Sequence, residues 1–181
     1  MKIEVPFSKA LRLINPGPVV LATSKYEEAV NIMAAASTTP ISHDPRLLGV
    51  SISPRRFTHE LIEQSGEFVL NIPGLNLARQ VKLCGTRSGR NIDKFREAHL
   101  TPAEAKLVSV PLIEECLGHL ECTLVEHYSL GDHTLFVGRV VVTQAEAGTF
   151  SETWLLDDEE AKRLHHLSGT YYGVLGARIR V

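Results

Sequence analysis

Short apolar segments bounded by turn residues follow one another through this sequence, without a helical segment between each pair. Two long ones, 119–130 and 132–147, are separated by Gly131 and Asp132 and predict a hairpin whose second arm bulges at Gly138. Runs of strands without regular alternation with helices favour an antiparallel β-barrel over a doubly wound sheet. The shorter predicted strands are 17–24 (GPVVLATS), 29–37 (AVNIMAAAS), 46–53 (RLLGVSIS) and 66–73 (GEFVLNIP).

Three segments predict helices at the periphery of this barrel. The first begins at Thr58, a capping residue, and ends before Gly66. The second covers 77–84 with apolar residues at helical spacing, and Gly85 is its expected C-cap. The third, 157–169, has acids first and bases last, and two histidines fall in its last turn, where the helix dipole favours positive charge.

The composition is that of a water-soluble globular protein. The 181 residues are 44% hydrophobic and 22% charged, with a net charge of −2, and we expect one domain over 1–181 that binds neither nucleic acid nor membrane. Charged residues interrupt the N-terminal apolar positions, and no run approaches the roughly 18 apolar residues of a membrane span. We therefore expect the protein in the cytoplasm.

The three cysteines do not suggest a disulfide framework, and this fits a reducing compartment. Cys116, His119 and Cys122 have a spacing that resembles a metal site. In a strand, however, Cys116 and Cys122 would share one face and His119 would lie on the other. The sequence thus predicts no metal site here and predicts cysteines that are buried as small apolar residues.

The common catalytic and phosphate-binding motifs are absent. The sequence has no GxGxxG after its first strand, no GxxxxGK[ST], no GxSxG and no HExxH. A Rossmann dinucleotide site, a P-loop, a hydrolase nucleophile elbow and a zinc protease site are therefore not supported.

One stretch combines small residues with positive charge. Ala34, Ala35 and Ala36 either let a flat ligand approach the backbone or pack under a helix, and the residues alone favour neither interpretation. Downstream, the helix start at Thr58 beside two arginines, 55–56, is typical of an anion site, or else of an ordinary cap with solvated charges.

The small residues and the helix start together suggest a flat ring system that ends in a phosphate. A further basic stretch, CGTRSGRNIDKF (84–95), carries two glycines and three cations. It would suit a phosphate or a dinucleotide, or else it is a solvated connection between helices.

The order of these segments resembles the flavin reductase-like FMN-binding proteins, a split-barrel family that includes flavoredoxin and small reductase components of two-component monooxygenases. The similarity is strongest over residues 10–145. It differs from many members at Ala34, where they carry Thr, and at Ser37, where they often carry an aromatic residue. The segments that carry the similarity are PGPVVLATS, NIMAAAS, TPISHDPRLLGVSISPRRFTHELI, SGEFVLNIP, CGTRSGRNIDKF and GDHTLFVGRV.

The resemblance implies an antiparallel split barrel that forms a homodimer with FMN near the interface. It implies that Arg56 and Thr58 hold the phosphate and that His133, in the GDH turn, lies near the ring and the nicotinamide as the catalytic candidate. The residues that it assigns to the cofactor are Asn31, Met33, Ala34, Ala35, Ser37, Ser51, Ile52, Ser53, Arg56, Thr58, Ser88, Gly89 and Lys94.

The implied activity is flavin reduction by NADH or NADPH, with hydride transfer from the nicotinamide to FMN. Such chemistry belongs to the cofactor and needs no side-chain acid or base, in keeping with the absence of a catalytic triad. Two alternatives stay open at this point. One is a flavoredoxin-type carrier that receives electrons from a redox partner protein, and the other is a ligand-binding barrel with no redox role.

Overall fold

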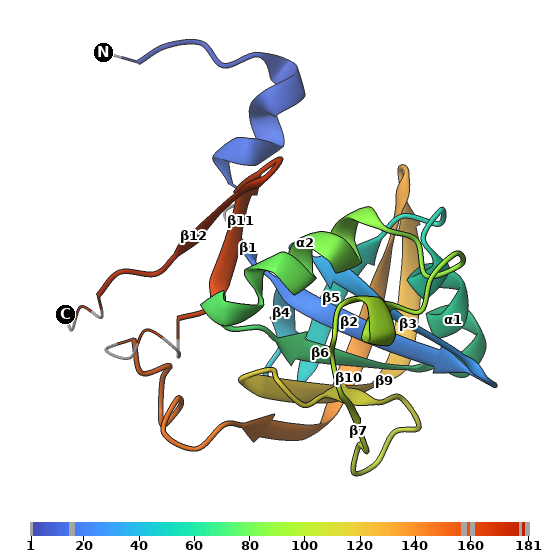
Figure 1. Cartoon of the computed structure of the whole chain (residues 1–181). Coiled ribbons are helices and arrows are strands. Elements are labelled where there is room, and N and C mark those ends of the chain that lie inside the picture. Colours follow the sequence, from blue (N-terminus) through green and yellow to red (C-terminus); the bar gives the residue numbers. More distant parts are fainter. Residues whose placement is uncertain (1, 15–16, 157–158, 160–161, 178, 180–181) are drawn as a thin grey trace.

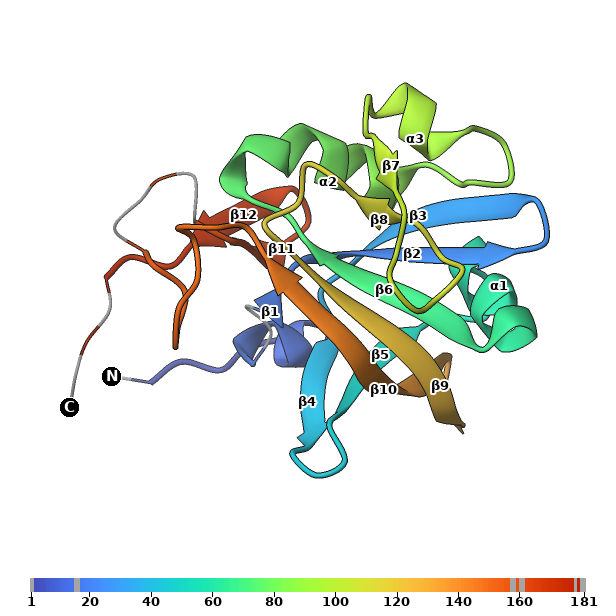
Figure 2. The same cartoon turned by 90° about the horizontal axis from the view of Figure 1, so that it is seen from below.

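A computed structural model describes residues 2–14, 17–156, 159, 162–177 and 179 of the chain. Its centre is a seven-stranded antiparallel sheet in the order β3-β2-β6-β9-β10-β5-β4, which curls into a split barrel (Figures 1 and 2). This arrangement confirms the predicted antiparallel barrel. Its strands are β2 (Val20–Tyr26), β3 (Ala29–Ala35), β4 (Thr38–Ser42), β5 (Leu47–Ile52), β6 (Glu67–Ile72), β9 (Gly118–Leu130) and β10 (His133–Ala145).

Alternating side chains of these strands fill the barrel. The interior is one apolar cluster. The Ser51 amide donates to the Ser37 carbonyl over 2.9 Å and so extends the pairing of β4 with β5 toward the end of β3. The predicted bulge is confirmed, because the register of β10 against β9 shifts between Val137 and Gly138. A Cβ at Gly138 would lie 2.4 Å from the Phe68 ring, so only glycine fits there. The fully enclosed members of the cluster include Ala22, Val50, Ile62, Phe68, Cys122 and Phe136.

Helix α1 (Phe57–Ser65) follows β5 and packs at the end of the barrel where β5 finishes and β6 begins. It ends at Gly66 in the left-handed conformation (φ 70°), as predicted. Its N-cap is Arg56, however, and Thr58 lies inside the first turn, so the predicted capping role of Thr58 is wrong. The reason is that the Thr58 hydroxyl is engaged by a side chain of β3, which is described below.

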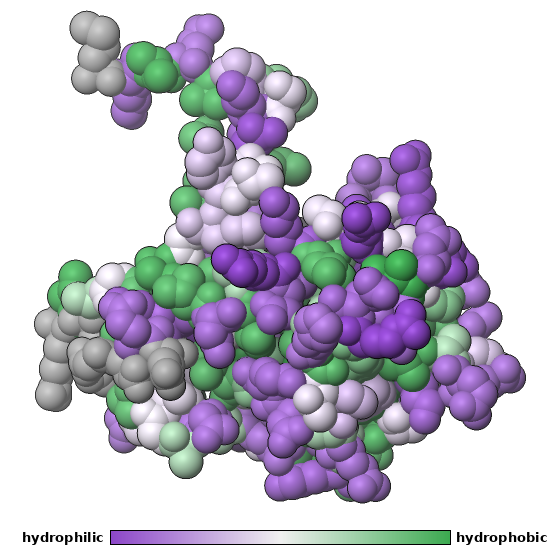
Figure 3. All heavy atoms as spheres, viewed as in Figure 1, coloured by the Kyte–Doolittle hydropathy of each residue, from purple (hydrophilic) through white to green (hydrophobic). Residues whose placement is uncertain are grey.

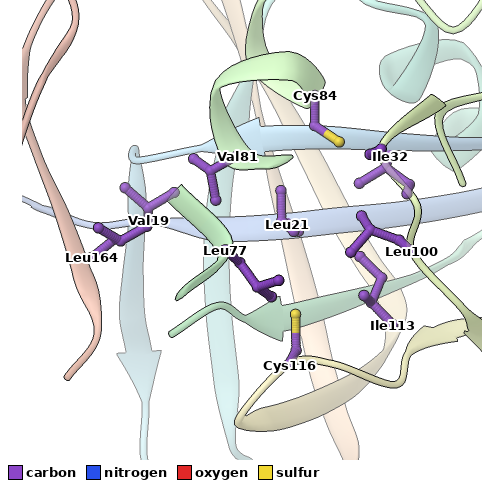
Figure 4. Packing of buried hydrophobic residues seen from close by; sticks show 11 residues of the cluster. Val19, Leu21, Ile32, Leu77, Val81, Cys84, Leu100, Ile113, Cys116 and Leu164 are labelled. Atoms are coloured by element: carbon purple, nitrogen blue, oxygen red, sulfur yellow. The ribbon is translucent and has the colours of Figure 1, made fainter. Parts of the chain in front are cut away.

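A second layer covers the outer face of β2, β3 and β6. It is formed by the short helix η2 (Leu75–Leu77) and helix α2 (Ala78–Thr86), and the predicted inward residues Leu77, Val81 and Cys84 are all buried. Figure 4 shows Leu77 and Val81 reaching toward Leu21 of β2. The predicted C-cap at Gly85 is wrong, because α2 continues through it to Thr86.

The C-terminal segment forms strands where a helix was predicted. Strands β11 (Leu164–Ser168) and β12 (Tyr171–Val174) form a hairpin that pairs with β1 (Gly17–Pro18), and Gly169 (φ 56°) lies in its turn. Backbone pairing with β1 and burial of Leu164 in the cluster beneath α2 outweigh the helix-like order of charges. The predicted role of His165 and His166 at the end of a helix is therefore wrong, because both lie in β11. Residues 157–158 and 160–161 of the predicted helix lie outside the described residues.

The remaining elements were not expected from the sequence. Helix α3 (Lys94–Glu97) follows the basic loop, and β7 (Pro102–Ala103) pairs with β8 (Leu112–Ile113). The 3₁₀ helix η1 (Phe7–Leu13) buries none of its residues and projects from the body (Figure 1). Within the described residues, no helix is long and apolar enough to cross a membrane.

The three cysteines are free and buried, as predicted. Cys116 precedes β9 and packs beneath α2, whereas Cys122 points into the barrel, so the prediction that they share one face is wrong. Burial raises the pKa of both thiols, that of Cys122 to about 12. His119 lies beside Asn71, 3.0 Å from Nδ1 to Oδ1, and the described residues contain no group of three His, Cys, Asp or Glu side chains suited to a metal ion.

Candidate functional site

Two cavities adjoin at Gly85, near the C-terminal end of α2. The first, here called the alanine cavity, measures about 420 Å³ and lies between the end of β3, α2 and the β11–β12 hairpin. The second, the arginine cavity, measures about 140 Å³ and lies between β3, the start of α1 and the loop 87–93. A ligand long enough to pass Gly85 could occupy both.

The floor of the alanine cavity is formed by Ala34, Ala35, Ala36 and Ser37. Their small side chains leave the backbone accessible, and β3 is an edge strand of the sheet, so its outward N–H and C=O groups have no strand to pair with. The close approach of α2 to this floor depends on Gly85, where an added Cβ would lie 3.3 Å from the Ala34 Cβ. The sequence left open whether the alanines pack under a helix or line a ligand site. They lie next to α2 and also line a cavity, so the structure is compatible with both interpretations.

The arginine cavity is lined by cations and by no carboxylate. Arg55, Arg56, Arg87 and Lys94 contribute to its wall, together with the first turn of α1. No side chain caps that helix, so its first backbone N–H groups remain available, and the helix dipole favours an anion there. Charge and free amides together are suited to a phosphate dianion.

Asn31 connects β3 to α1 inside this cavity. Its Nδ2 donates to Oγ1 of Thr58 over 2.7 Å, and both side chains are buried. The Asn31 Oδ1 is buried without a hydrogen-bond partner, which is costly for an amide oxygen unless a ligand or water donates to it. Gly89 packs directly against this amide, because a Cβ there would lie 2.0 Å from Oδ1.

Lys94 holds the two sides of the cavity together. Its Nζ donates to the carbonyl oxygens of Ile32 on β3, over 2.6 Å, and of Cys84 on α2, over 2.8 Å. Burial lowers the pKa of Lys94 to about 8, with the Cys84 thiol raising it and the Arg56 guanidinium lowering it further. Burial in turn raises the pKa of Cys84 to about 11. An anion in the cavity would favour the charged form of Lys94.

Arg90 of the basic loop does not join this group. Its Nη2 lies 2.6 Å from Oε2 of Glu60, and its guanidinium stacks over the Phe57 ring at 4.7 Å. The sequence suggests three free cations in this loop, but Arg90 is paired with Glu60 and does not line the cavity.

Ten of the cofactor residues inferred from the sequence line these cavities. The arginine cavity contains Asn31, Met33, Arg56, Thr58, Ser88, Gly89 and Lys94, and the alanine cavity contains Ala34, Ala35 and Ser37. The other three, on or just after β5, line neither. Ile52 points into the barrel and is 1% exposed, while Ser51 and Ser53 are half-buried beside it.

His133 is also apart from both cavities. It lies at the tip of the β9–β10 hairpin with its side chain 45% exposed, and its Nδ1 is 2.8 Å from Oδ1 of Asp132. The hydrogen bond from His133, followed by the nearby charge of His133, lowers the pKa of Asp132. A contact of His133 with a ring stays a prediction.

The sequence missed the contribution of the C-terminal hairpin. His166, Gly169 and Tyr172 line the alanine cavity, and the rings of His166 and Tyr172 lie 5.3 Å apart. The available signal was the glycine between LHHLS and TYYGV, which separates two short strand-like segments. The helix-like charge order before it concealed this signal.

Comparison with known proteins gives consistent similarities. The family described as "Flavin reductase like domain" matches residues 12–165. An NADH-dependent flavin reductase of Rhodococcus sp is 34% identical over 137 residues, which are 73% of this chain and 72% of that protein. The FMN-binding protein of Thermus thermophilus, solved with bound 1-cyclohex-2-enone, superimposes with a TM-score of 0.83 and 30% identity over 100% of this chain and 98% of that one. Flavoredoxin of Desulfovibrio vulgaris (Miyazaki F) shares the fold, with a TM-score of 0.82 and 24% identity over 91% and 90% of the two chains.

Proposed function

Because the chain belongs to the flavin reductase-like domain family, we propose that it binds FMN and catalyses reduction of the flavin by NADH or NADPH. The observation that carries this proposal is the pairing of the two cavities. A flat, small-residue floor adjoins a pocket with four cations and no carboxylate, and FMN combines a flat ring with a phosphate. The NADH-dependent reductase relative supports the choice of electron donor.

The described residues fit FMN in two respects. The arginine cavity would hold the phosphate through Arg56, Arg55, Arg87 and the first-turn amides of α1. The buried, unpaired Oδ1 of Asn31 would accept a hydrogen bond from a hydroxyl of the ribityl chain, which removes the cost of its isolation. The alanine cavity would receive the ring.

FMN, when bound, supplies the redox chemistry by accepting a hydride equivalent from the nicotinamide. The protein's part is to bind, orient and shield. The edge amides of β3 would donate to polar atoms of the ring and stabilise negative charge there. No acid or base from the chain is needed for this step.

We further propose that the chain forms a homodimer with the FMN site near the interface. The N-terminal arm presents large apolar side chains to solvent, including Phe7 at 95% and Ile14 at 84% exposure. Figure 3 shows hydrophobic residues, in green, on the projecting arm. Exposed apolar surface of this kind is typical of an interface. The C-terminal hairpin, which borders the alanine cavity, also exposes Tyr171 at 75%. Size-exclusion chromatography with light scattering would test the dimer.

The phosphate contact is tested by comparing FMN with riboflavin. We expect the protein to bind FMN at least tenfold more tightly, since a charge-assisted contact contributes about 1.5–3 kcal/mol. Arg56→Gln should reduce this preference, whereas Arg79→Gln, on the exposed first turn of α2 and outside the cavity, should leave it unchanged. Equal affinity for both flavins in the unaltered protein would contradict the assignment of the arginine cavity.

The electron donor is tested by anaerobic mixing of the FMN-loaded protein with NADH or NADPH. Loss of the yellow absorbance within seconds supports the reductase. No loss with either nicotinamide, together with reduction by a ferredoxin, supports the carrier of the flavoredoxin type. A protein that takes up no added FMN would instead be a barrel without a redox role.

A further inference from the structure

The barrel is open at the end opposite α1. Helix α1 connects the end of β5 to the start of β6, so it covers one mouth of the barrel, and the other mouth lies where β5 begins and β6 ends. A cavity of about 340 Å³ occupies this second mouth. That is the space of roughly ten water molecules at about 30 Å³ each. We call it the barrel mouth.

The floor of the barrel mouth is apolar. Its inward side chains continue the interior cluster of the barrel, so they are held by strand pairing and need no ligand to order them. They are Val20, Leu48, Leu70, Leu120 and Val140. A floor of aliphatic groups at a barrel mouth favours a hydrocarbon or aromatic group.

The rim of the barrel mouth is cationic. Arg46 and Arg163 line it, and none of its lining residues is acidic. Thr38, Thr39 and Ser42 add hydroxyl groups on the β4 side. The combination of an apolar floor with a cationic rim distinguishes this mouth from the polar arginine cavity.

Arg163 is the decisive side chain of the rim. Its guanidinium lies over the Trp154 ring, 4.8 Å from the ring centroid, and its Nε is buried with no hydrogen-bond partner. Among the described residues Arg163 forms no salt bridge. Burial of the guanidinium lowers its pKa. A half-buried guanidinium without an anion is costly, and a carboxylate is its best-matched partner because the planar fork accepts two oxygens.

We propose that the barrel mouth binds a small organic carboxylate, with its apolar or aromatic group on the aliphatic floor and its carboxylate on Arg163. The Trp154 ring fixes the plane of the guanidinium from the other side, which leaves its edge for the ligand. Arg46 supplies a second positive charge at the entrance.

This site is separate from the proposed flavin site. The two share Val19 in their walls but no cation, so binding of the carboxylate needs no FMN. The proposal therefore stands or falls independently of the proposed function.

Calorimetry on the full chain tests the proposal, with 4-phenylbutanoate as the probe and 4-phenylbutanol as its uncharged counterpart. We expect the acid to bind at least tenfold more tightly than the alcohol. Arg163→Gln should abolish this preference, and Arg139→Gln, an exposed arginine of β10 outside the cavity, should keep it. Val140→Phe, which fills the floor, should remove binding of both probes, and thermal unfolding shows which variants are folded.

Three results would overturn the proposal. Equal binding of the acid and the alcohol would mean that Arg163 does not select an anion. Absence of binding to the folded full chain would mean that the mouth is not a ligand site. Binding that appears only in a Phe7→Ser, Leu11→Ser double variant would show that the apolar N-terminal arm, from the same or a second copy, occupies the mouth.

Discussion

The side-chain amide of Asn31 donates a hydrogen bond to Oγ1 of Thr58 over 2.7 Å and so joins strand β3 to the first turn of α1 within the arginine cavity. Because Thr58 accepts this bond, its own hydroxyl proton remains to be donated to an anion. Strand β3, which borders the cavity proposed for the ring, and the start of α1, which faces the cavity proposed for the phosphate, are thereby held in one geometry. Preorganisation of this kind favours binding, since less ordering is needed when the ligand arrives.

Asn31→Ala should weaken FMN binding and destabilise the fold. The substitution removes the bond to Thr58 and the Oδ1 acceptor from a buried position, so we expect the dissociation constant to rise about tenfold and the free energy of unfolding to fall by about 1–3 kcal/mol. Fluorescence titration with FMN and urea unfolding measure the two effects. Asn91→Ala, in the exposed part of the neighbouring loop, is the control. Unchanged FMN affinity in Asn31→Ala would refute a role for this amide in the site.

Gly89→Ala should displace the basic loop. The new Cβ would lie 2.0 Å from Oδ1 and 2.7 Å from Cγ of Asn31, and the buried amide cannot move away without losing its bond to Thr58. Overpacking of this kind costs about 1–3 kcal/mol, and the shifted loop should bind FMN more weakly. Gly176→Ala, where a Cβ would meet nothing within 4 Å, should change neither stability nor affinity. If Gly89→Ala and Gly176→Ala have the same stability and the same FMN affinity, the close contact at Gly89 contributes to neither.

Lys94 should make the stability of the FMN-free protein rise with pH in the alkaline range. Burial sets its folded pKa at about 8, below the ordinary 10.5, so between these values the unfolded chain still holds a proton that the folded chain has lost. Stability rises with pH wherever the unfolded state binds more protons, and the gain between pH 7.5 and 9 is on the order of 1 kcal/mol. Urea unfolding over this range measures it. Above about pH 9 the three buried thiols, whose pKa values burial raises, make stability fall with pH.

The matched comparison for this pH effect is Lys94→Met, which should lack the alkaline gain whatever its absolute stability. Lys106→Met, at an exposed lysine, should retain it. FMN should also bind more weakly above about pH 8, because its phosphate favours the charged form of Lys94. Parallel pH curves for the unaltered protein and Lys94→Met would exclude Lys94 as the source.

The barrel could be predicted because each of its strands shows its own local pattern of apolar residues. Strand pairings between segments that are distant in sequence could not be predicted in this way. The bulge at Gly138 could be inferred because the glycine interrupts its own strand. The hairpin containing Tyr172 could not, because its partner strand β1 lies at the other end of the chain and its charges imitate a helix. For the same reason seven residues that line the arginine cavity were named from the sequence, whereas the C-terminal wall of the alanine cavity was missed.

Tyr172→Ala should weaken binding of FMN and riboflavin by the same factor. Tyr172 lines the alanine cavity with His166, so its ring would contact the isoalloxazine and not the phosphate. An aromatic contact contributes about 0.5–1.5 kcal/mol, which corresponds to a roughly twofold to tenfold loss of affinity for both flavins. Tyr171→Ala is the control, because Tyr171 is adjacent in sequence but 75% exposed and outside the cavity. If only the affinity for FMN falls, Tyr172 contacts the phosphate and not the ring. If Tyr172→Ala and Tyr171→Ala lose the same affinity, the alanine cavity does not hold the ring.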